Sequence, residues 1–128
     1  MQKRLNCFLG ILCVSILISC GKEAQEVDPN YVGYWLGQGS CEPGMRIKAN
    51  GDGTYKATRQ VSDCDNMDHR GTARIQGDKL KIGSKHLHID SAPTATAPHS
   101  VHMSLNGEFT STMQLVLEGD TYYRLDGY

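Results

Sequence analysis

Residues 45–61, MRIKANGDGTYKATRQV, decide the expected fold. The apolar residues Met45, Ile47 and Ala49 alternate with polar or charged neighbours, a period of two that is typical of a half-buried strand. The turn cluster NGDG follows at residues 50–53, and the rest of the stretch returns with the character of a partner strand. We therefore predict an antiparallel hairpin with one apolar face and one solvated face.

Two cysteines near this hairpin are predicted to form a disulfide across its open end. Pairing about the centre of the turn places residue 41 opposite about residue 62, which brings Cys41 and Cys64 together. Two cysteines in an oxidising compartment favour one disulfide. Closing a loop of 64 − 41 = 23 residues would stabilise the fold by about 3 kcal/mol in the chain-entropy model. Two free thiols, or half of a metal site, are the alternatives.

The remainder of the chain after Tyr31 consists of short alternating stretches separated by glycine turns. Further strands are expected at 32–36, 72–76, 79–82, 85–90, 101–105, 109–117 and 121–125, with turns at Gly77-Asp78, Asn106-Gly107 and Gly119-Asp120. Residues 91–100 hold Pro93 and Pro98 and are predicted to be a loop. The pattern predicts an all-β, antiparallel meander of eight or nine strands. Closure into a small barrel would hide the edges most completely, and a β-sandwich is the alternative.

The N-terminal residues have the layout of a secretory signal. Lys3 and Arg4 supply positive charge, and an almost wholly apolar run follows from Phe8 to Ile18. This run is shorter than the ~20 residues that a helix needs to cross the hydrocarbon core of a membrane. We therefore expect export from the cytoplasm rather than a permanent transmembrane span.

The signal ends in Leu17-Ile18-Ser19-Cys20, which resembles the lipobox of bacterial lipoproteins. The resemblance implies that residues 1–19 are removed and that Cys20 receives lipid and becomes the N-terminus. Several acyl chains anchor a protein stably, since each buried methylene contributes about 0.8 kcal/mol. Gly21, where inner-membrane lipoproteins often carry aspartate, favours the outer membrane, at its periplasmic face or at the cell surface. Residues 20–30 would form a tether, and a soluble secreted protein cut elsewhere is the alternative.

The mature chain would have 128 − 19 = 109 residues, enough for one domain at 31–128. Its charge is slightly negative, because 13 − 2 = 11 basic residues face 14 acidic ones. The basic residues are scattered along the sequence and do not cluster, so nucleic acid is not an expected partner.

The domain resembles the lipocalin-like family of small bacterial β-barrels. Gly33-Tyr34-Trp35 is similar to the G-x-W motif that opens lipocalins, and Arg124 matches the arginine of their last strand. The resemblance implies that Trp35 closes one end of the barrel beneath Arg124, a pairing worth roughly 0.5–2 kcal/mol. The likeness extends loosely over 31–125. The domain is shorter than a typical lipocalin and lacks a flanking helix, and its features also fit small barrel-shaped inhibitors of secreted hydrolases.

The histidines raise a metal hypothesis, because all five lie between positions 69 and 102. His86 and His88 are two apart on a predicted strand and share a face, with Asp90 next in line. Neutral imidazoles with a carboxylate suit zinc or copper, and His99 and His102 could complete such a site. The alternative is that His86 and His88 simply occupy the solvated face opposite Leu87 and Ile89.

The sequence contains no nucleophile elbow or phosphate-cradling loop, so we predict that the protein is not an enzyme and needs no cofactor. The first functional hypothesis is a lipid-anchored envelope protein that binds a small apolar or amphipathic ligand inside its barrel. The second is a protein-interaction module, such as a hydrolase inhibitor or an envelope assembly factor, that works through 61–70 and 91–100. The third is metal handling by the histidines.

Overall fold

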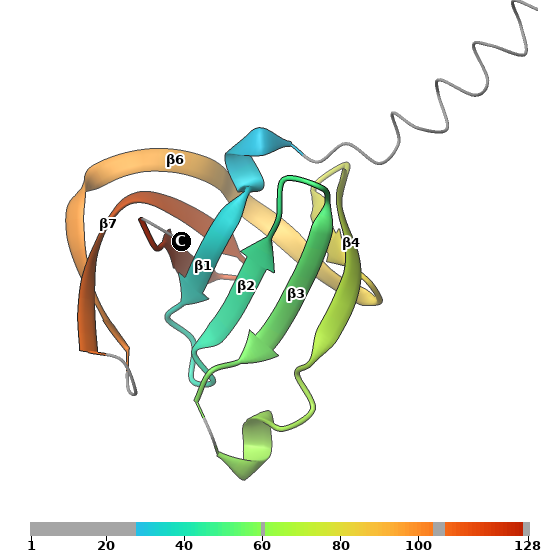
Figure 1. Ribbon diagram of the computed structural model, residues 1–128, viewed down its shortest axis with the longest axis horizontal. Helices are drawn as coiled ribbons and strands as arrows, with labels where there is room; N and C mark the ends of the chain where they lie inside the picture. Colours follow the sequence, from blue (N-terminus) through green and yellow to red (C-terminus); the bar gives the residue numbers. More distant parts are fainter. Residues whose placement is uncertain (1–27, 60, 104–106, 127–128) are drawn as a thin grey trace, which may run out of the picture.

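Eight antiparallel strands follow one another around a closed ring in the order of the chain (Figure 1). The computed structural model describes residues 28–59, 61–103 and 107–126. The strands are β1 (Gly33–Gly37), β2 (Pro43–Ile47), β3 (Asp52–Ala57), β4 (His69–Gln76), β5 (Lys79–Ile82), β6 (Lys85–Met103), β7 (Gly107–Leu117) and β8 (Asp120–Arg124), with short 3₁₀ helices η1 (Pro29–Tyr31) and η2 (Ser62–Cys64). Pairing of β8 with β1 closes the ring, which confirms the predicted all-β meander.

The hairpin expected from residues 45–61 forms as β2 and β3. Met45 and Ile47 are buried, whereas Arg46 between them is exposed, so the period of two sorts this strand as predicted. The turn is tighter than expected, because Lys48 and Asp52 are joined by a backbone hydrogen bond of 2.9 Å. It is centred on Asn50, and Ile47 therefore pairs with Gly53.

This register corrects the predicted pairing at the open end of the hairpin. Residue 41 lies opposite Arg59, whose backbone N–H donates to the carbonyl oxygen of Cys41 at 3.2 Å. The strand expected to reach Val61 ends at Ala57, and η2 then turns the chain back. The predicted disulfide between Cys41 and Cys64 is confirmed, with Cα atoms 5.7 Å apart.

Strand β4 passes from one neighbour to the next halfway along its length. It pairs with β3 through residues 69–72 and with β5 through residues 73–76. The backbones approach closely at this point, because a Cβ atom on Gly83 would lie 2.2 Å from the carbonyl oxygen of Arg70. Gly83 also has a φ of +58°, which glycine adopts more readily than other residues. Glycine therefore permits the close approach of the turn after β5 to β4.

The prediction of a loop at residues 91–100 is wrong, because these residues lie within β6. This strand pairs with β5 through residues 85–88 and with β7 from Ile89 to Met103. Pro93 and Pro98 fall in register shifts of the β6–β7 pairing. The regular backbone hydrogen bonds are already interrupted there, so the N–H that proline lacks is not needed. Two expected strands are therefore one, which gives eight strands in the described part of the chain.

The last hairpin also differs by one residue from the prediction. Leu117 pairs with Asp120, so the turn consists of Glu118 and Gly119 rather than Gly119 and Asp120. Both turn residues have positive φ, 50° and 78°, as a type I′ turn requires. The turn expected at Asn106 falls outside the described residues.

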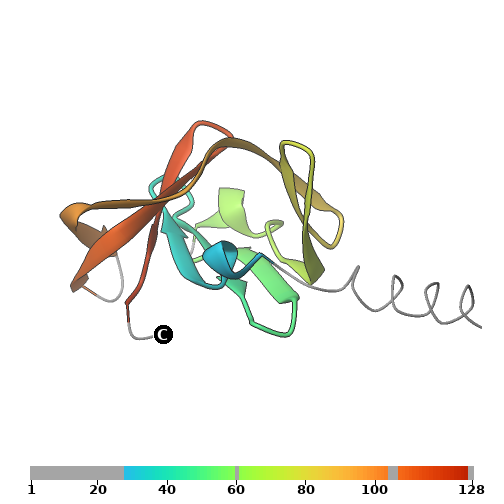
Figure 2. The same ribbon diagram turned by 90° about the horizontal axis from the view of Figure 1, so that it is seen from above.

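The far half of the β6–β7 hairpin extends beyond the rest of the ring, which is uneven in outline (Figures 1 and 2). It folds over the outer face of β1 and β8 and forms a second small core there. This core contains Leu36, Val101 and Leu125, with Tyr34, Phe109 and Tyr123 packed against it. The ring of His99 also stacks on that of Tyr123, with centroids 4.4 Å apart. The hairpin is therefore packed against the domain and is not a free arm.

Candidate functional site

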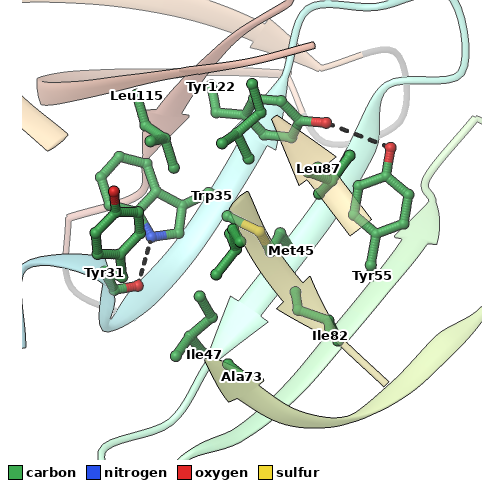
Figure 3. Close-up of a cluster of buried hydrophobic side chains, with 12 residues drawn as sticks. Tyr31, Trp35, Met45, Ile47, Tyr55, Ala73, Ile82, Leu87, Leu115 and Tyr122 are labelled. Atoms are coloured by element: carbon green, nitrogen blue, oxygen red, sulfur yellow. Dashed lines mark hydrogen bonds between the residues drawn. The ribbon is translucent and has the colours of Figure 1, made fainter. Parts of the chain in front are cut away.

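The interior of the ring is filled by large apolar and aromatic side chains (Figure 3). The main core consists of Tyr31, Trp35, Met45, Ile47, Tyr55, Ala73, Leu80, Ile82, Leu87, Leu115, Leu117 and Tyr122, none more than 4% exposed. These residues come from η1 and from all eight strands. Any molecule inside the ring would have to displace side chains that already pack against one another.

Two tyrosine hydroxyls form a polar contact within this core. The hydroxyl oxygens of Tyr55 and Tyr122 lie 3.3 Å apart and share a hydrogen bond (Figure 3). Burial raises the pKa of both phenols, so both stay neutral at physiological pH. Among the described residues, no buried side-chain nitrogen or oxygen is left without a partner. This pair therefore stabilises the interior and does not present a reactive group.

The three residues predicted to close the barrel lie together. Trp35 and Arg124 are opposite one another in the β1–β8 pairing, and the guanidinium carbon lies 6.0 Å from the centroid of the Trp35 ring. The indole N–H donates to the carbonyl oxygen of Tyr31 at 2.9 Å. A Cβ atom on Gly33 would lie 2.9 Å from Cδ of Arg124, so glycine leaves room for the arginine.

The predicted lipidation site, Cys20, lies outside the described residues, as does most of the predicted tether. Within residues 28–126, apart from the gaps at 60 and 104–106, no helix is long and apolar enough to span a membrane.

His88 lies between two carboxylates instead of pairing with His86 around a metal. Its Nδ1 is 3.1 Å from Oδ1 of Asp90, and its Nε2 is 3.0 Å from Oδ2 of Asp78. The backbone N–H of Gly119 donates to Oδ2 of Asp90 at 2.7 Å. No group of three or more His, Cys, Asp or Glu side chains in the described part of the chain is arranged to hold a metal ion.

The contact between His88 and Asp90 predicts that the stability of the fold depends on pH. The hydrogen bond that His88 donates to the Asp90 carboxylate raises the pKa of His88, and the hydrogen bond from the Gly119 N–H lowers the pKa of Asp90. A raised folded-state pKa means that His88 stabilises the fold below the ordinary histidine pKa of about 6.5, and that this contribution is lost as pH rises through the folded value. In an NMR titration, Asp90→Asn is expected to lower the His88 pKa.

The matched control for this titration is Asp63→Asn, which neutralises an exposed carboxylate in η2. It should leave the His88 pKa in place. An equal shift in both variants would show that overall charge, and not the contact with Asp90, sets the pKa.

The most distinctive surface of the domain is a group of cations on the outer side of β2, β3 and β4. Arg46 pairs across the strands with Thr54, and Thr54 pairs with Arg70. Lys48 directly follows β2, two residues after Arg46, and Lys56 lies two residues along β3 from Thr54. Strand spacing places these four cations within roughly 10 by 14 Å. We call Arg46, Lys48, Lys56 and Arg70 the basic outer face.

Shallow pockets lie between these side chains. One of about 370 Å³ is lined by Arg46, Lys48, Asp52, Gly53, Thr54, Arg70, Gly71 and Thr72. A second joins the cations to the start of the domain, since Val32, Gly33 and Tyr34 line it together with Arg46 and Lys48. These two pockets lie on the polar and positively charged face outside the ring.

The basic outer face is not visible as a cluster along the sequence, because its cations come from separate strands. The alternation that placed Arg46 and Lys48 on the solvated side was visible, but Arg70 is 70 − 46 = 24 residues away from Arg46. Only the pairing of three strands brings them together. The cross-strand register is thus the signal that would have identified the face.

Comparison of the chain with protein-family models, curated proteins and solved structures found no match.

Proposed function

We propose that this protein is a lipid-anchored, non-enzymatic envelope protein of the outer membrane that acts through its outer surface. The observation that carries the proposal is the packed interior, in which Trp35, Met45 and Leu115 are each 0% exposed. A small apolar ligand inside the ring, the first hypothesis from the sequence, has no support from such packing. An interaction module that presents its outer faces to a partner agrees better with it.

The anchor in this proposal rests on the sequence alone. The charged and apolar signal followed by Leu17-Ile18-Ser19-Cys20 supports lipid on Cys20. A lipocalin-like relationship is part of the proposal, and the contact of Gly33, Trp35 and Arg124 supports it. The disulfide between Cys41 and Cys64 is consistent with an oxidising compartment.

Native mass spectrometry of the protein extracted from envelope membranes tests both parts at once. We expect the mass of residues 20–128 plus covalent acyl chains on Cys20, because the lipobox directs cleavage before that residue. We also expect no second, non-covalent molecule released on unfolding, because the interior is full of side chains.

The control is Cys20→Ala, which should abolish the covalent lipid. The mature, signal-cleaved form should then no longer be found in the membrane fraction. Cleavage at another position would overturn the anchor. A small apolar molecule that is retained in the folded protein and lost on unfolding would overturn action through the outer surface.

A further inference from the structure

We propose that the basic outer face rests on the phosphate-bearing headgroups of the membrane that holds the anchor. This inference rests on the proposed lipid anchor and adds a defined surface and a lipid chemistry to it. The net charge of the mature chain is 11 − 14 = −3, so a patch of four cations opposes the overall charge of the domain. Attraction to an anionic surface would therefore select one orientation.

The cations of this face are poorly neutralised by the protein itself. Among the described residues, Arg46, Lys48 and Lys56 form no ion pair, and Arg70 pairs only with Asp68, at 3.5 Å on the exposed surface. Such exposed pairs contribute little and exchange readily. The carboxylate of Asp52 lines a pocket together with Arg46, Lys48 and Arg70, and it accepts a hydrogen bond from the side-chain amide of Asn50 at 3.2 Å.

The chemistry of the face suits phosphate. Arginine binds phosphate oxygens through paired N–H donors, and lysine adds compact positive charge. The guanidinium carbon of Arg46 lies 5.2 Å from the centroid of the Tyr34 ring, which supports the arginine on the outer side of the sheet. Thr54, which carries a hydroxyl, lies between Arg46 and Arg70 in the same cross-strand row.

The position of the chain entry favours a membrane over other polyanions. The chain enters the domain through η1, which lies at the start of β1 beside β2 (Figure 1). Val32 and Gly33, which directly follow η1, share a pocket with Arg46 and Lys48. Cys20 and Asp28 are only 28 − 20 = 8 positions apart, a span of at most about 30 Å. A lipid on Cys20 would thus hold this face close to the headgroups.

Vesicle sedimentation tests the proposal with the mature chain, residues 20–128, carrying Cys20→Ser so that no lipid contributes. We expect binding to vesicles of phosphatidylglycerol and phosphatidylcholine, none to phosphatidylcholine alone, and loss of binding in high salt. Each cation near an anionic surface contributes about fivefold to partitioning. Combining R46Q, K48Q, K56Q and R70Q should therefore weaken binding by at least about tenfold.

The matched control combines R59Q, R74Q, K79Q and K81Q, which changes the net charge equally, from −3 to −3 − 4 = −7. It should bind nearly as the parent does, and near-UV circular dichroism should show both variants folded. Equal weakening in both variants, no binding to the anionic vesicles, or binding only to a soluble polyanion such as polyphosphate would each overturn the proposal. These results do not depend on whether Cys20 carries lipid, so a failed anchor and a failed face are distinguishable.

Discussion

Replacing Trp35 with alanine is expected to lower the free energy of unfolding by about 3–5 kcal/mol. The indole is 0% exposed and contacts the core on one side and Arg124 on the other. The substitution also leaves the carbonyl oxygen of Tyr31 without its 2.9 Å donor. Since small domains are stable by only about 5–15 kcal/mol, this loss would leave the protein close to unfolding. Urea denaturation followed by far-UV circular dichroism measures it.

The control for this experiment is Val61→Ala, because Val61 is an apolar side chain that is 40% exposed. The free energy of unfolding of this variant should stay within about 0.5 kcal/mol of that of the parent. An effect of Trp35→Ala as small as that of Val61→Ala would contradict a tightly packed ring interior with the indole at its centre.

Removing the disulfide with Cys41→Ser and Cys64→Ser together is expected to lower the free energy of unfolding by about 3 kcal/mol. The bond closes a loop of 23 residues that contains β2, β3 and η2 in full. Without it, the unfolded chain regains the conformations that the loop excludes. The same urea titration measures the change, and it also shows whether the transition stays cooperative.

A reducing agent provides the control for the disulfide. It should destabilise the parent to the level of the double variant and leave the double variant itself unchanged. Stability of the parent that did not respond to reduction would contradict a stabilising disulfide between Cys41 and Cys64.

The fold was largely predictable because local patterns specify most of it. A period of two identifies which residues of β2 face inward, and glycine turns mark the ends of most strands. The disulfide followed from the same hairpin. The register did not, because the NGDG cluster allows more than one turn geometry, and the observed turn centred on Asn50 moves the partner of Cys41 from about residue 62 to Arg59.

The long β6 was unpredictable for a physical reason. Proline is a strong signal for loops, yet a strand with one unpaired edge and several register shifts accommodates it. Whether Pro93 and Pro98 fall at such register shifts depends on how β7 pairs with β6, and this pairing cannot be seen in the local sequence around the prolines. The basic outer face was hidden in the same way, because three strands must pair before Arg46 and Arg70 become neighbours. Of the predicted metal residues, His88 and Asp90 do meet, but with Asp78 in a hydrogen-bonded group.

The seam between β1 and β8 also constrains how the protein folds. Trp35 and Arg124 are 124 − 35 = 89 residues apart, so the ring closes by joining nearly the two ends of the domain. Such a contact carries a large loop-closure entropy and slows folding. Until β8 is available, β1 has one unpaired edge, and the β6–β7 hairpin has no surface of β8 on which to pack. We therefore expect closure of the seam and docking of the hairpin to be late steps that depend on each other, since β8 contributes to both the inner core and the outer one.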